Sequence, residues 1–281
     1  MAQYDQQYTP SASPPALRPS RLAAVLLLDL LIVVAALLAT ALGLVALIVA
    51  FRVMQQGLSP GEVAGLSRAD QLRLIGVDGI LLVLIVQNII FIGVPLVRTR
   101  LIRREPLASI GLQAPRPLRL TLIGLGLGVL LLVGNAVIGA LFASAGIRQN
   151  QADQYPLFAG DYLGQALFML GAAVIVPIGE EVLFRGYVFH TLRRMFADAR
   201  WGLVGAYLLS SAVFGVAHSL AATEGVVALI IPTMLLGLAL AWVVNRTGSL
   251  IPAIIAHAMN NGVALLALVT CINNPGMCPG L

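Results

Sequence analysis

Residues 163–190 have the sequence LGQALFMLGAAVIVPIGEEVLFRGYVFH. This stretch is long and apolar enough to cross a bilayer, because a membrane-spanning helix needs about 20 predominantly apolar residues. It nevertheless carries Glu180 and Glu181 side by side. An ionised side chain at the membrane centre costs about 2.5–3.5 kcal/mol on insertion scales, so an intramembrane acid is a candidate functional residue by default. The stretch therefore predicts a transmembrane helix that contains a site.

The composition of the whole chain extends this interpretation. Of the 281 residues, 59% are hydrophobic and only 10% are charged, whereas about a quarter of the residues in a typical soluble domain are charged. We predict an all-α, polytopic transmembrane helical bundle. Seven apolar blocks are long enough to span; they are residues 22–51, 74–97, 118–145, 163–190, 202–223, 225–244 and 249–271. The first block has about 30 residues, so a split or re-entrant element would make eight.

The basic residues predict the orientation. All 17 are arginines, and 12 of them lie before the first block or in the loops after the second, fourth and sixth blocks, whereas the alternate loops carry only Arg52, Arg68, Arg73 and Arg148. The positive-inside rule makes those segments cytoplasmic, with the N-terminus inside and the C-terminus outside the cell (plasma or inner) membrane. Arginines that flank long apolar spans are explained by topology, so we expect no nucleic-acid partner. Cys271 and Cys278 lie near the external end, where a disulfide or two unpaired thiols are both consistent with the sequence.

We divide the chain into four parts. Residues 1–21 are rich in Pro, Ser, Gln and Tyr and lack an apolar run, which is typical of a disordered cytoplasmic tail. Residues 22–160 are expected to form N-terminal transmembrane helices, residues 161–271 a helical core, and residues 272–281 a C-terminal tail.

Polar side chains in the second half of the chain form a candidate site. His218 and His257 lie inside apolar blocks, with Phe214 four residues before the first and Asn261 four residues after the second. Residues four apart share a helix face. A carboxylate that takes a proton from water, a histidine that relays it, and a second histidine with an amide that stabilises an oxyanion are the parts needed for peptide hydrolysis.

Simpler roles are open for several of these residues. Glu181 and Arg185 are spaced as an i,i+4 ion pair that satisfies both charges and orients the neighbouring glutamate, and Phe214 is expected to pack against the His218 ring. At about 1.5 Å per helical residue, His218 reaches the depth of the glutamate pair only if residues 193–205 are largely a surface connector. Asp29, inside the first block, has no explanation in the sequence.

Three motifs together resemble a known family. Glu-Glu-x-x-x-Arg (from Glu180), Phe-x-x-x-His (from Phe214) and His-x-x-x-Asn (from His257), in that order on apolar helices, resemble the CPBP family of intramembrane proteases. This family, also called the CAAX-protease and bacteriocin-processing or Abi family, includes the type II CAAX prenyl endopeptidases. The resemblance covers roughly residues 163–271 and makes the core of residues 161–271 a CPBP-type catalytic core; residues 1–160 match only as generic spans.

The resemblance implies a function for each motif residue. Glu180 and His218 would activate the water, His257 and Asn261 would form the oxyanion site, and Glu181 would act with Arg185 in support. The implied activity is that of an intramembrane endopeptidase, with a site open to the cytoplasm. Its partners would be membrane lipid and a peptide or membrane-protein substrate, prenylated or not.

Two mechanisms and two other function classes stay open. In a glutamic-type mechanism there is no cofactor; in the alternative, Glu180, His218 and His257 hold a zinc ion whose bound water attacks. The sequence has no His-Glu-x-x-His helix, which favours the metal-free mechanism. The same polar core would also suit a non-catalytic scaffold or immunity protein, or a proton-coupled transporter. Its confinement to the second half of the chain disfavours a transporter built from repeats.

Overall fold

The computed structural model describes residues 18–147, 155–219 and 226–278. In these three stretches the regular structure is entirely helical, without strands. Among the described residues, seven helices are long and apolar enough to cross a membrane, which confirms the prediction of an all-α transmembrane bundle. The outer faces of these helices carry many exposed leucines and valines, as expected where lipid rather than water surrounds the protein. Most of the predicted disordered tail, residues 1–17, lies outside the described residues, as do residues 279–281.

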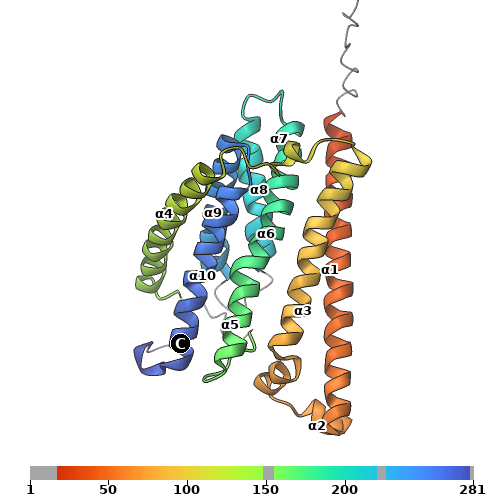
Figure 1. The fold of residues 1–281 in the computed structure, drawn as a ribbon, viewed down its shortest axis with the longest axis vertical. Helices are drawn as coiled ribbons and strands as arrows, with labels where there is room; N and C mark the ends of the chain where they lie inside the picture. Colours follow the sequence, from red (N-terminus) through yellow and green to blue (C-terminus); the bar gives the residue numbers. More distant parts are fainter. Residues whose placement is uncertain (1–17, 148–154, 220–225, 279–281) are drawn as a thin grey trace, which may run out of the picture.

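The first two spans form a pair on one side of the molecule (Figure 1). Helix α1 (Pro19–Gln56) is continuous over 38 residues, so the first apolar block does not split. It begins three residues before the predicted boundary, with a proline in its first turn, where a missing N–H is harmless. The short helix α2 (Pro60–Ala64) is capped by Ser59 and leads into α3 (Arg68–Leu96).

The second span is longer than predicted. Beyond α3 the helix continues as the π-helix η1 (Val97–Ile102), so the span reaches Ile102 rather than residue 97. After the 3-10 turn η2 (Leu107–Ile110), helix α4 (Pro117–Ser144) packs against α10 on the opposite side of the molecule from α1 (Figure 1).

The fourth span carries the glutamate pair and is only partly α-helical. It runs through α5 (Tyr162–Leu170), the π-helix η4 (Gly171–Ile175), α6 (Val176–Glu180), the π-helix η5 (Glu181–Phe189) and α7 (His190–Met195). Every residue of η5 is buried. A helix that is buried all round must be central to its bundle, and π-turns occur frequently at functional sites.

The last three spans close the bundle around the fourth. They are α8 (Gly202–Ser219), α9 (Val226–Thr247) and α10 (Ile251–Asn273). The chain then ends in the short 3-10 helix η6 (Pro275–Met277). A disulfide joins Cys271 to Cys278.

The predicted connector over residues 193–205 is wrong. Helix α7 continues to Met195 and α8 already begins at Gly202, so the connector is residues 196–201. The turn is this tight because Gly202 lies directly on the backbone of Phe196, where a Cβ atom would collide with the carbonyl. Glu180 and His218 nevertheless lie at a similar depth in the bundle, because Glu180 precedes the connector by about as many residues as His218 follows it.

Candidate active site

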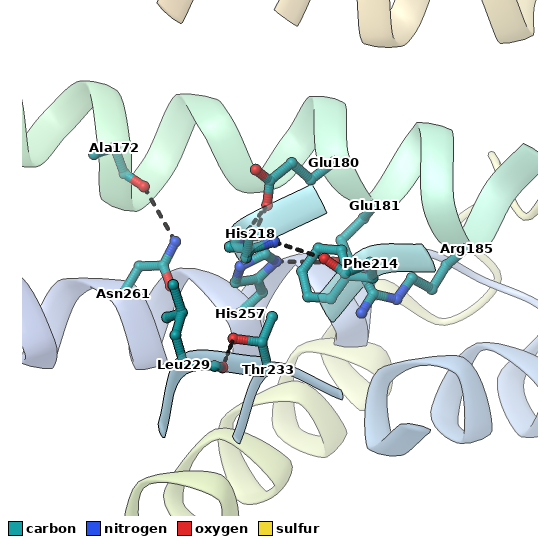
Figure 2. Close-up of polar contacts among 10 residues, drawn as sticks. All are labelled: Ala172, Glu180, Glu181, Arg185, Phe214, His218, Leu229, Thr233, His257 and Asn261. Atoms are coloured by element: carbon teal, nitrogen blue, oxygen red, sulfur yellow. Dashed lines mark hydrogen bonds and ion pairs between the residues drawn. The ribbon is translucent and has the colours of Figure 1, made fainter. Parts of the chain in front are cut away.

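The two adjacent glutamates point in different directions. Glu180 is the last residue of α6 and Glu181 the first residue of η5, and both are buried. Consecutive residues of a helix project about 100° apart. Glu180 therefore faces the rings of His218 and His257, whereas Glu181 faces Arg185 and the other side of His257 (Figure 2).

Glu181 is the centre of a buried polar cluster. One carboxylate oxygen, Oε1, accepts hydrogen bonds from Arg185 Nη1 and His257 Nδ1, both at 2.8 Å. The ion pair expected from the i,i+4 spacing is thus present. The Arg185 guanidinium also lies 3.9 Å from the centre of the Phe214 ring, a cation–π contact. A fully buried arginine is tolerated here because a carboxylate and an aromatic face both compensate its charge.

Both histidines present the same ring nitrogen to Glu180. His218 Nδ1 lies 2.9 Å from the Phe214 carbonyl oxygen, and His257 Nδ1 contacts the Glu181 carboxylate. Since both partners accept hydrogen bonds, Nδ1 carries the proton in each ring. In the neutral rings, Nε2 then holds the lone pair.

The three side chains converge without touching. Glu180 Oε2 lies 3.8 Å from His218 Nε2 and 3.6 Å from His257 Nε2. Both separations exceed hydrogen-bonding distance and are of the kind that a water molecule bridges. Within the described part of the chain, this carboxylate oxygen is buried and has no hydrogen-bond partner.

Phe214 and Asn261 complete the group of candidate residues. The buried Phe214 ring packs against both histidine rings, with centroids 4.4 Å from His218 and 5.8 Å from His257. Asn261 lies one turn beyond His257 on α10, and its Nδ2 donates to the carbonyl of Ala172 in η4 at 3.3 Å. The structure therefore brings together Glu180, Glu181 and five further predicted residues, which are Arg185, Phe214, His218, His257 and Asn261.

The structure also explains Asp29. It is buried in α1 and accepts hydrogen bonds from Arg98, at 2.8 Å from Nε, and from the hydroxyl of Tyr187 in η5. Sequence reasoning missed this network because it placed Arg98 in a loop, whereas the helix continues through η1. The sequence offered one signal for this pairing: Asp29 and Arg98 carry opposite charges and lie near the same membrane face on the first two spans.

A second missed residue is Asn88 of α3, which is buried and bonded to the backbone of the fourth span. No sequence pattern links a single asparagine to a helix 91 residues later.

A zinc ion would need three suitably placed ligands. Across residues 18–147, 155–219 and 226–278, no group of three or more His, Cys, Asp and Glu side chains could hold a metal ion.

Comparison with known proteins identifies the region that holds this site. The family model of type II CAAX prenyl endopeptidase Rce1-like proteins matches residues 162–263, a range that contains all three motifs. Residues 162–263 are Rce1-like. The resemblance drawn from the motifs is thereby confirmed. The Rce1-like match, together with the long apolar helices, supports a multi-pass membrane protein.

The chain also has a relative among curated proteins. The chain is 29% identical over 106 residues to UPF0177 protein YxdF of Lactococcus lactis subsp. lactis (strain IL1403). The match covers 36% of this chain and 51% of that protein, so the chain spans about half the length of the curated relative it matches. No solved structure matches.

Proposed function

We propose that this protein is an intramembrane endopeptidase that hydrolyses a peptide bond with water activated by Glu180 and His218. The observation that carries the proposal is the convergence of three side chains from three spans. Glu180 Oε2 faces the Nε2 atoms of His218 and His257 at 3.8 and 3.6 Å. A single water can hydrogen bond within this group, in which Glu180 and His257 are buried and His218 is partly exposed.

The first step is attack by water. Glu180 has a carboxylate oxygen with no partner among the described residues, so it can take a proton from a bridging water. The lone pair on His218 Nε2 accepts the second water hydrogen and orients the oxygen. The water oxygen bonds to the carbonyl carbon of the peptide while its proton moves to the glutamate. The same proton then passes to the leaving amine as the C–N bond breaks.

The second requirement is stabilisation of the oxyanion. His257 can donate from Nε2 only as the imidazolium, because its Nδ1–H is already held by Glu181. The Glu181 carboxylate, 2.8 Å from Nδ1, holds the ring so that Nε2 lies on the side of Glu180. The Asn261 amide has two hydrogens, and its bond to Ala172 uses one. The second is available to an oxyanion.

Within this cluster the Glu181 carboxylate and the Arg185 guanidinium form a buried ion pair at 2.8 Å. Buried charges persist when they are paired and hydrogen bonded. No step passes through a metal ion, and zinc remains the alternative that chelation tests.

We further infer that the N-terminus is cytoplasmic and that the site opens toward the cytoplasm of the cell membrane. The arginine-rich segments, which include residues 97–116 and 193–200, lie at the end of the bundle where α1 begins (Figure 1). The described chain ends at the opposite end, after α10. The positive-inside rule assigns the first of these ends to the cytoplasm.

The test is cleavage by the purified full-length protein in detergent. The substrates are a quenched fluorescent peptide library and a farnesylated CAAX peptide. Glu180→Gln and His218→Ala are compared with Glu62→Gln, a matched change at an exposed acid of α2. We expect turnover to fall about 10²–10⁴-fold in the first two variants, to persist in the third, and to survive chelators.

Three results would change the assignment. Turnover that Glu180→Gln leaves intact would refute the proposed base. Loss of turnover on chelation, restored by zinc, would assign a metalloprotease. Folded protein that cleaves none of the peptides would favour a scaffold, an immunity protein or a transporter.

A further inference from the structure

Of the polar contacts that the first half of the chain makes with the fourth span, one lies next to Glu180. Helix α3 packs against α6, the short segment that ends at Glu180. Asn88 lies in this contact, 5% exposed, within the span that runs from Arg68 to Ile102. A polar side chain buried in a membrane protein is costly unless its hydrogen bonds are made. Its partners therefore indicate why it is there.

Both ends of the Asn88 amide are bonded. Its Oδ1 accepts from the backbone N–H of Gly179 at 2.9 Å, and its Nδ2 donates to the Leu84 carbonyl at 3.1 Å. Gly179 lies in α6 and immediately precedes Glu180. The asparagine thus supplies an acceptor one residue before the proposed base.

The two helices approach too closely here for a side chain on Gly179. A Cβ atom at this position would collide with Asn88 Oδ1 and lie 3.2 Å from Phe91 Cβ. The glycine and the asparagine are therefore two parts of one contact. Neither α3 nor Asn88 falls within the Rce1-like residues 162–263.

The position of this contact matters because of the helix type around it. Segment α6 has five residues and lies between the π-helices η4 and η5. The backbone hydrogen bond of a π-turn joins residues five apart, whereas that of an α-turn joins residues four apart. If the junction moved by one residue, Glu180 would rotate by about 100°, away from both histidines.

We propose that Asn88 is a positioning residue for Glu180. Its bond to the Gly179 N–H fixes where the α-segment lies between the two π-helices, and so holds the Glu180 carboxylate opposite His218 and His257. The inference rests on the proposed function, in which Glu180 is the base. It gives helix α3, which lies outside the Rce1-like residues, a part in positioning the base.

A double-mutant cycle tests the contact. Asn88→Ala removes the acceptor, and Gly179→Ala adds the Cβ that collides with it. Each single change should lower kcat about 10–100-fold with KM changed less than threefold, because a misplacement of about 1 Å can cost 10²-fold. Combining them removes the collision, so the double variant should be no slower than the slower single variant.

Asn135→Ala is the matched control. Asn135 of α4 donates to Asn260 of α10, a hydrogen bond between helices that does not involve the fourth span. This variant should keep kcat within threefold of the wild type. Thermal unfolding of each variant shows whether it is folded. Unchanged kcat in folded Asn88→Ala, or full additivity in the cycle, would overturn the proposal.

A spectroscopic measurement separates this proposal from the proposed function. The infrared band of the Glu180 carboxyl group is obtained by subtracting the spectrum of Glu180→Gln from that of the wild type. Asn88→Ala should shift that band, and Asn135→Ala should not, whether or not a cleaved peptide is found. An unshifted band in Asn88→Ala refutes the positioning role. Turnover that does not depend on Glu180 refutes the proposed function instead.

Discussion

Replacing Glu181 by glutamine should destabilise the protein, whereas the same change at Glu180 should not. Glu181 is fully buried and its Oε1 holds Arg185 and His257 at 2.8 Å each. The substitution leaves a buried arginine without its counter-ion. Removing one partner of a buried pair costs about 3–5 kcal/mol, and glutamine keeps an acceptor oxygen, so we expect about 3 kcal/mol. At about 2–4 °C per kcal/mol this lowers the Tm by about 6–12 °C.

Glu180 provides the internal control. Its Oε2 has no hydrogen-bond partner in the described residues, so neutralising it removes a buried charge without breaking a bond. Thermal unfolding in one detergent should place Glu180→Gln within about 3 °C of the wild type, or above it. Adding Arg185→Met to Glu181→Gln should recover part of the loss, because both charges are then removed. Equal Tm values for the two glutamine variants would refute this reasoning.

Three further predictions follow from other contacts. Asp29→Ala should lower the Tm more than Asp29→Asn, which keeps an acceptor for the Tyr187 hydroxyl. Although burial raises the pKa of the Glu105 carboxyl, hydrogen bonding and charge from Arg194 lower it below its usual 4.5. The stability that the Glu105–Arg194 interaction contributes is present above about pH 4.5 and is lost as pH falls through the lowered pKa of Glu105. The Tm of Glu105→Gln should therefore fall less with acidification than that of wild type. Reducing the Cys271 disulfide should leave turnover unchanged, because it lies about 15 Å beyond Asn261 along α10; a slower reduced enzyme would contradict this.

The span count and the site were predictable because both depend on local patterns. Each apolar block is about as long as the bilayer is thick, and four-residue spacing places Phe214 under His218 and Asn261 beside His257. Glu180 and His218 are about equally far from the connector that joins α7 to α8, so they meet even though the predicted connector was too long.

The missed features depend on packing between distant segments. The hydrophobic pattern of residues 171–189 does not distinguish an α-helix from the π-helices η4 and η5. The bond of Asn88 to Gly179 depends on the distance between α3 and α6. The pairing of Asp29 with Arg98 depends on a helix that continues past the last apolar residue as η1. None of these leaves a periodic signal in the sequence.

The role of Glu180 as the base is tested by turnover of one cleaved peptide by wild type, Glu180→Gln and Glu62→Gln, each with chelator present. We expect that only Glu180→Gln loses activity, by about 10²–10⁴-fold, with its Tm retained. Cleavage by folded Glu180→Gln within threefold of the wild-type rate would contradict it.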